Sequence, residues 1–173
     1  MAQIAVLVED LFEDVEYREP VEAFRRAGHG VVCLGLKKGA LIRGKRGEEV
    51  ITIEVEVGSA DPLSFDALFI PGGYSPDRLR AHKEPLLFVR AFMETPKPVL
   101  LICHAPQLLI SAKMLDGRKV TGYKSIIQDI KNAGAEFVDS SVVVDGNLVS
   151  SRGPADLAAF IETSLKVLAS YIY

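Results

Sequence analysis

The sequence predicts an α/β fold, in which a mostly parallel sheet carries helices on both faces. Short, continuously apolar segments alternate with amphipathic segments of helical length, as is typical of strands that are covered on both sides. The chain of 173 residues has the usual size of one domain, and no repeat, linker or low-complexity segment divides it. We therefore expect a single domain over residues 1–173. In such sheets, functional sites lie beyond the carboxyl ends of the strands.

The first half of the chain supplies the first alternating elements. Pro20 lies inside the first helical pattern and predicts a kink there or a later start. The alternating segment 40–57 turns on two glycines, which indicates a hairpin or paired short strands. The expected elements are a strand at 4–9, a helix at 14–27, a strand at 31–36, the hairpin at 40–57 and a strand at 66–70.

The second half continues the alternation. Asp145–Gly146 is a dipeptide typical of a tight hairpin turn, and Pro154 suits the first turn of the closing helix. The expected elements are a helix at 84–95, a strand at 98–102, helices at 104–115 and 124–134, a hairpin at 141–151 and a helix at 154–172.

Composition narrows the possible functions. A net charge of −3 gives no electrostatic reason to expect nucleic acid or an anionic membrane as a partner, and no apolar run approaches the roughly 20 residues that span a bilayer. The N-terminus has no basic start and no small-residue cleavage site, so we expect a mature first strand. The two cysteines lack paired-ligand spacing, which argues against a disulfide scaffold or a zinc site. We expect a cytoplasmic protein without metal or cofactor.

Cys103 and His104 stand where a predicted strand meets a predicted helix. A cysteine there lies near free backbone N–H groups and the positive end of the helix dipole, which favour the reactive thiolate. Packing explains the position equally well, because cysteine is commonly buried. Gly72 and Gly73 follow another buried strand at the same edge. Their N–H groups could bind an oxyanion, or the two glycines could simply form the turn at the end of the strand.

An acidic segment, residues 9–16, forms the third part of this edge. Most of its carboxylates suit helix capping, but one could point inward and exchange a proton with the thiol. The spacing does not choose which. The G-x-x-x-x-G-K pattern at 39–45 is unlike a phosphate-binding loop, because Arg46 replaces Ser or Thr and a strand pattern follows.

Several motifs together resemble the PfpI-type intracellular protease family. They are "FEDVE", "DALFIPGGYSPDRLR", "ICHAPQLLISA", "LDGRKVTGY" and "NAGAEFVDSSVVVDGNLVSSRGPADL", and they cover nearly the whole chain in order. The family is part of the superfamily that contains the Parkinson-associated deglycase and the class I glutamine amidotransferase domains. The resemblance implies a flavodoxin-like three-layer sandwich with a nucleophile elbow at Cys103.

The resemblance also implies residue roles. Glu13 would be a buried, protonated acid hydrogen-bonded to the Cys103 sulfur, with His104 as the elbow histidine. Backbone N–H groups of Gly73 and His104 would form the oxyanion site beside Gly72. Asp77 would reach across a subunit interface to orient the histidine, although it is one methylene shorter than the glutamate of the archaeal proteases.

Tyr123, Arg152 and Pro154 would line the substrate pocket. The family resemblance further implies a homodimer or higher homo-oligomer.

The function implied is that of a stress-response enzyme acting on small reactive aldehydes or their protein adducts. The Cys103 thiolate would add to the aldehyde while His104 or Glu13 moves the proton. Two alternatives stay open, namely a cysteine peptidase and a non-enzymatic redox sensor or chaperone that uses oxidation of Cys103. An amidotransferase subunit fits poorly, because the downstream His-x-Glu pair is absent from the sequence.

Overall fold

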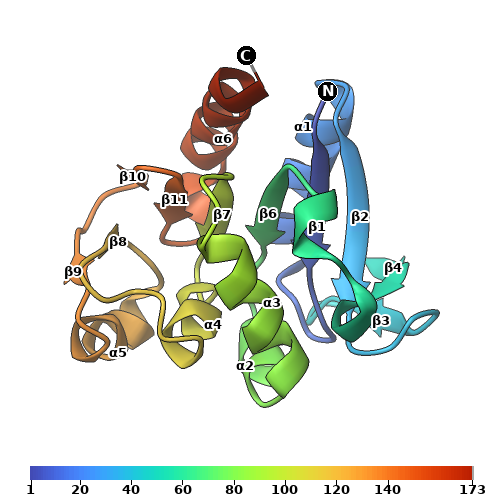
Figure 1. Ribbon diagram of the computed structural model, residues 1–173, viewed down its shortest axis with the longest axis horizontal. Coiled ribbons are helices and arrows are strands. Elements are labelled where there is room, and N and C mark those ends of the chain that lie inside the picture. The colour runs from blue at the N-terminus through green and yellow to red at the C-terminus, as the bar shows by residue number, and fades with distance from the viewer. Residues whose placement is uncertain (173) are drawn as a thin grey trace.

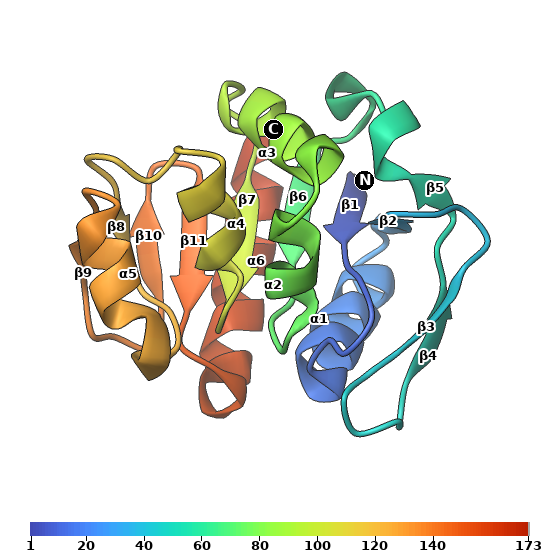
Figure 2. The ribbon, with the colours of Figure 1, turned by 90° about the horizontal axis from the view of Figure 1, so that it is seen from below.

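The computed structural model describes residues 1–172, which form a seven-stranded sheet in the order β10-β11-β7-β6-β1-β2-β5 (Figures 1 and 2). All neighbouring strands are parallel except β10 and β11, which form an antiparallel pair at one edge. The strands are β1 (Gln3–Leu7), β2 (Gly30–Gly35), β5 (Val55–Glu56), β6 (Ala67–Ile70), β7 (Val99–Ile102), β10 (Val143–Asp145) and β11 (Leu148–Ser151). The predicted α/β sandwich with a mostly parallel sheet is confirmed.

Helices cover both faces of the sheet (Figure 2). One face carries α1 (Asp14–Arg26) and α6 (Leu157–Ile172), which contact each other. The opposite face carries α2 (Ser75–Arg80), α3 (Lys83–Met93), α4 (Pro106–Ser111) and α5 (Ile127–Asn132). Four short 3-10 helices join these elements: η1 (Val57–Ser59), η2 (Pro62–Ser64), η3 (Lys124–Ile126) and η4 (Pro154–Asp156).

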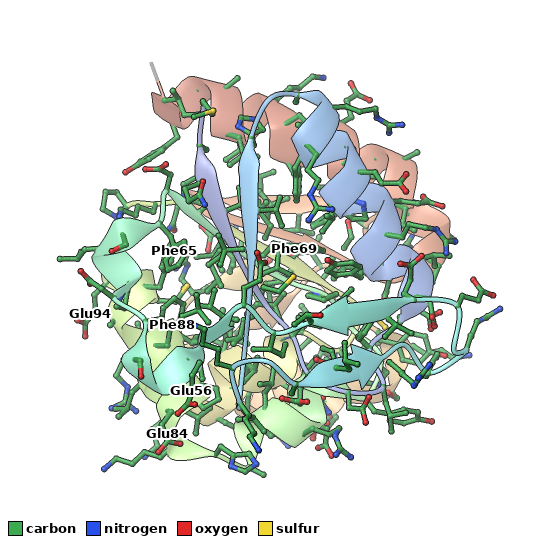
Figure 3. All side chains as sticks on the ribbon, turned by 90° about the vertical axis from the view of Figure 1, so that its right-hand side faces the viewer. Glu56, Phe65, Phe69, Glu84, Phe88 and Glu94 are labelled. Atoms are coloured by element: carbon green, nitrogen blue, oxygen red, sulfur yellow. The ribbon has the colours of Figure 1, made fainter. Side chains whose placement is uncertain are left out.

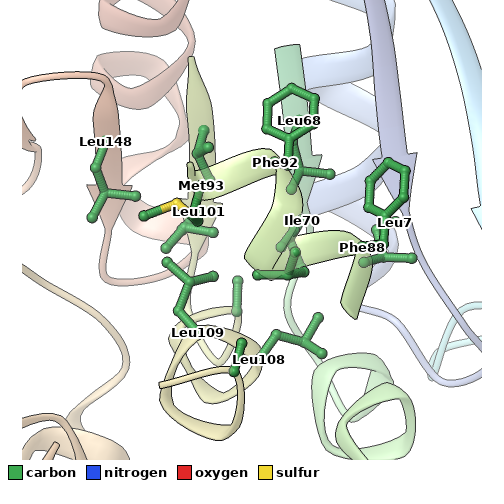
Figure 4. Close-up of a cluster of buried hydrophobic side chains, with 14 of the residues drawn as sticks. Leu7, Leu68, Ile70, Phe88, Phe92, Met93, Leu101, Leu108, Leu109 and Leu148 are labelled. Carbon is green, nitrogen blue, oxygen red and sulfur yellow. The ribbon is translucent and has the colours of Figure 1, made fainter. Parts of the chain in front are cut away.

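Alternation along the central strands produces two separate hydrophobic cores. Leu68 and Ile70 of β6 point toward α3 and α4, where they join the cluster shown in Figure 4. Phe69 between them points toward α1 and packs edge-on against Phe24 at 5.7 Å. Figure 3 shows this division, with Phe88 and Phe69 on different sides of the sheet. The period of two in strand side chains thus fixes the three layers.

Two small sheets lie beside the main one. The antiparallel hairpin of β3 (Leu41–Arg43) and β4 (Val50–Thr52) runs alongside α1, and a short parallel pair joins β8 (Lys119–Val120) to β9 (Glu136–Phe137) (Figure 2). The predicted hairpin is therefore shorter than 40–57. Its last part leaves the hairpin because Glu54 N–H bonds the Cys33 carbonyl at 2.9 Å, which aligns β5 with β2.

Most other boundaries differ from the prediction by one or two residues, but the predicted helix 104–115 is shortened to α4, which ends at Ser111. Pro20 lies within α1, which begins at Asp14, so the helix neither starts later nor breaks there. The predicted helix 124–134 opens as the 3-10 turn η3, and 154–172 opens as η4. The short α2 is absent from the prediction because its six residues are too few for a periodic pattern.

We expect Leu101→Ala to destabilise the protein by about 2–5 kcal/mol, because it leaves a cavity in the fully buried centre of β7. Urea denaturation measures the free energy of unfolding. Leu63→Ala is the matched control, since that side chain is 70% exposed. Equal losses in the two variants would contradict the packing described.

Candidate active site

Cys103 lies at a sharp elbow directly after β7. Its φ of 62° is in the left-handed region, which non-glycine residues rarely adopt. Two backbone hydrogen bonds hold this conformation: Cys103 N–H donates to Ser151 at 3.0 Å, and its carbonyl accepts from Tyr123 N–H at 2.9 Å. The elbow carries the side chain out at the carboxyl edge of the sheet, although the residue is only 6% exposed.

Gly72 and Gly73 leave room for the elbow. A Cβ on Gly72 would lie 2.7 Å from the Cys103 Cβ, and one on Gly73 would lie 2.4 Å from the Glu13 nitrogen. Gly73 also has a φ of 77°. The N–H groups of Gly73 and His104 face the sulfur and lower the pKa of the thiol, so the two predicted oxyanion donors do converge.

The acid beside the sulfur is Glu16, and the expectation that Glu13 hydrogen-bonds to Cys103 is wrong. Glu16 is fully buried in the first turn of α1, and its carboxyl interacts with the Cys103 side chain and the Gly72 backbone. Neither oxygen has a partner at good hydrogen-bond geometry within the described chain, so both depend on this loose contact. Burial, followed by the charge of Glu13, raises the pKa of Glu16 to about 8. Glu16 is therefore the carboxyl that keeps its proton at neutral pH.

Glu13 instead forms an ion pair. Its Oε2 lies 2.6 Å from Lys45 Nζ, and its Oε1 lies 3.5 Å from Arg46 Nε. Both cations come from the turn between β3 and β4. The two carboxyls lie three residues apart along the chain, and the local sequence does not reveal which one meets the distant hairpin.

The Cys103 thiol is harder to ionise than its position in the sequence suggested. Burial raises its pKa, and so does the negative charge of Glu16, whereas Gly73 and His104 N–H groups and the Lys45 charge lower it. When Glu16 is protonated, it carries no charge and no longer raises the pKa of the thiol by repulsion. The thiol and Glu16 therefore titrate as a coupled pair, in which ionising one makes ionising the other harder.

His104 contacts the thiol from the other side. Its Nδ1 lies 3.2 Å from Cys103 Sγ, its Nε2 lies 3.2 Å from Ser125 Oγ, and its ring packs on Tyr123 at 4.9 Å. Burial, then the charge of Lys45, lowers the pKa of His104, so the neutral imidazole is favoured. The sequence did not indicate Ser125, since a serine two residues after a tyrosine carries no distinctive signal.

Asp77 is exposed on α2, and no hydrogen bond or ion pair joins it to His104 within residues 1–172. Its charge nevertheless raises the pKa of His104, against the larger opposing effects. A contact with the histidine of a neighbouring subunit remains a prediction.

The predicted pocket residues come together beside the elbow. Tyr123, Arg152 and Pro154 line a mainly apolar pocket of about 360 Å³, together with Phe137 and Ile127. The Arg152 guanidinium lies 2.8 Å from Asp156 and 3.1 Å from Asp139.

The described residues contain no group of three or more His, Cys, Asp or Glu side chains placed to bind a metal ion. Across residues 1–172, no helix has both the length and the apolarity needed to cross a membrane.

Titration of Glu16 makes stability depend on pH. Because its folded pKa of about 8 exceeds the ordinary value of 4.5, the stabilisation is complete below pH 4.5 and is lost as the pH rises toward 8. Relative to Glu16→Gln, we expect wild type to lose about 1.4 kcal/mol per pH unit between about pH 5 and pH 8. Urea denaturation across this range measures it, with the exposed Glu94→Gln as control. A pH-independent difference between wild type and Glu16→Gln would contradict the assignment.

Relatives with known names match almost the whole chain. The model of the DJ-1/PfpI family matches residues 2–167. The Escherichia coli "Protein/nucleic acid deglycase 2" is 49% identical over 97% of this chain and 98% of its own length. The Bacillus subtilis "Putative cysteine protease YraA" is 51% identical over 96% of this chain and 98% of its own length.

Solved structures also match the fold over almost the whole of this chain. A two-domain protein from Anabaena variabilis, with DJ-1/ThiJ/PfpI-like and ferritin-like domains, gives a TM-score of 0.96 at 39% identity, covering 98% of this chain and 48% of that one. The ThiJ/PfpI domain protein of Brachyspira murdochii gives a TM-score of 0.90 at 26% identity, covering 97% of this chain and 96% of that one. The flavodoxin-like sandwich with its cysteine elbow, and the agreement along the chain, show that this protein belongs to the DJ-1/PfpI family.

Proposed function

We propose that this protein is a cysteine-dependent enzyme that acts on reactive aldehydes such as methylglyoxal, or on their adducts with macromolecules, without a cofactor. The observation that carries the proposal is the Cys103 sulfur held between a proton-bearing Glu16 and the ring nitrogen of His104 at 3.2 Å. This arrangement provides a nucleophile, a proton donor and a proton acceptor within one small site.

Methylglyoxal illustrates the chemistry. The Cys103 sulfur forms a bond to the aldehyde carbon and its proton leaves for a neighbouring base, while the former carbonyl oxygen takes a proton from Glu16 to give a hemithioacetal. Gly73 and His104 N–H groups stabilise the oxyanion as it develops. His104 then moves the proton from the former aldehyde carbon to the adjacent carbon, and the hydroxyl proton passes to the ketone oxygen, which leaves a 2-hydroxy thioester. Water hydrolyses the thioester, releasing lactate and the free thiol.

Glycated macromolecules are candidate substrates for the same chemistry. The name of the Escherichia coli relative refers to protein and nucleic acid. Because this chain has a net charge of −3, an adduct on protein suits it better than a long nucleic acid. A cytoplasmic location suits two free cysteines, and a homo-oligomer that brings Asp77 near His104 is part of the proposal.

A cysteine peptidase is the second candidate, favoured by the name of the Bacillus subtilis relative. The 6% exposure of Cys103 weighs against it, because an extended peptide needs an open groove along the nucleophile.

We expect glutathione-independent lactate formation from methylglyoxal to vanish in Cys103→Ser, and to fall about 100-fold in Glu16→Gln and in His104→Ala, the usual size of a proton-transfer contribution. Chiral lactate analysis of purified protein provides the measurement. Cys33→Ser is the matched control, because Cys33 is buried on β2 away from the elbow.

Equal turnover by wild type and Cys103→Ser would contradict the proposal. Cleavage of a fluorogenic peptide that depends on Cys103, with no lactate formed, would establish the peptidase instead.

A further inference from the structure

The turn between β3 and β4 brings Lys45 to the active site. The Lys45 N–H donates to the Phe12 carbonyl at 2.8 Å. The fully buried Asp14 carboxylate accepts N–H bonds from Arg46 at 2.9 Å, Glu48 at 3.0 Å and Glu49 at 2.9 Å. The turn is therefore fastened to the start of α1, the helix that carries the catalytic acid.

The Lys45 side chain extends over the oxyanion loop. Its Nζ lies 5.8 Å from the ring centroid of Tyr74, the residue that follows Gly73, and 2.6 Å from the Glu13 carboxylate. The ammonium is close enough to lower the pKa of both Cys103 and His104. The loop and the thiol are thus within the electrostatic range of one cation.

Two cations of the turn lie beside one carboxylate at this rim. Lys45 and Arg46 share the single carboxylate of Glu13, whose Oε1 is buried without a good hydrogen bond. Glu16 keeps its proton at neutral pH and adds no charge. Glu48 and Glu49 are engaged with Arg18 at 3.4 Å and 3.0 Å. Arg46 therefore offers Glu13 a second cationic partner besides Lys45.

We propose that Lys45 is a specificity-determining residue, which binds the anionic group of carboxylate-bearing ligands whose reacting carbon contacts Cys103. The inference deepens the proposed function, since it concerns the same sulfur. Carbonyl compounds that carry a carboxylate would bind in preference to neutral ones, and a hydroxy-acid product would be held by the same ammonium. A neighbouring cation offers this selectivity without any dedicated anion pocket.

Two alkylating reagents test the inference without turnover. Iodoacetate and iodoacetamide form the same bond to sulfur and expel the same iodide, but only iodoacetate carries a carboxylate. The measured quantity is the ratio of their rates at Cys103, followed by intact mass and divided by the ratio for N-acetylcysteine. We expect Lys45→Met to lower this ratio about 5-fold, as loss of one partly solvated charge implies, and Lys45→Arg to retain it.

Two further variants sharpen the test. Glu13→Gln removes the competing carboxylate and should raise the ratio. Lys83→Met, at the exposed start of α3, removes an equal charge elsewhere and should leave the ratio unchanged. The iodoacetamide rate reports separately whether the thiol stays folded and reactive. An unchanged ratio in Lys45→Met, or an equal fall in Lys83→Met, would overturn the inference. Either result would leave the proposed aldehyde chemistry intact, because lactate formation tests that chemistry separately.

Discussion

The left-handed backbone of Cys103 is the constraint on which the site depends. At a φ of 62° the chain turns from β7 toward α4 within a few residues, and the thiol projects at the carboxyl edge of the sheet. Such strain persists only where the surroundings impose it. Backbone bonds to Ser151 and Tyr123 do so, and Gly72 gives the space in which the thiol and the acid meet.

Charge around this elbow is divided between two carboxyls of one helix. Glu16 lies deep and neutral against the sulfur, whereas Glu13 lies at the rim with Lys45 and Arg46. The charge on Glu13 helps to keep the proton on Glu16, and the cations compensate Glu13 in turn. The structure thereby separates a proton-bearing acid beside the sulfur from a charged acid at the entrance.

The alternation of apolar segments was enough to predict the parallel sheet and its longer helices, and it placed Cys103 at the edge where such sheets carry their sites. The choice between Glu13 and Glu16 was not available from the sequence, because it depends on where the hairpin carrying Lys45 packs against α1. Ser125 was missed for a similar reason, since η3 brings it to His104. The sequence favoured a low pKa for the thiol, but burial raises this pKa, and burial depends on how the whole chain packs.

The chemistry of the site depends on the proton of Glu16, which infrared difference spectroscopy between wild type and Glu16→Gln can detect. We expect a protonated carboxyl band in wild type at neutral pH, which is absent in Glu16→Gln and disappears as the pH rises past about 8. The band should survive in Glu13→Gln. Absence of the band from wild type at neutral pH, or its loss in Glu13→Gln alone, would show that Glu16 does not carry the proton.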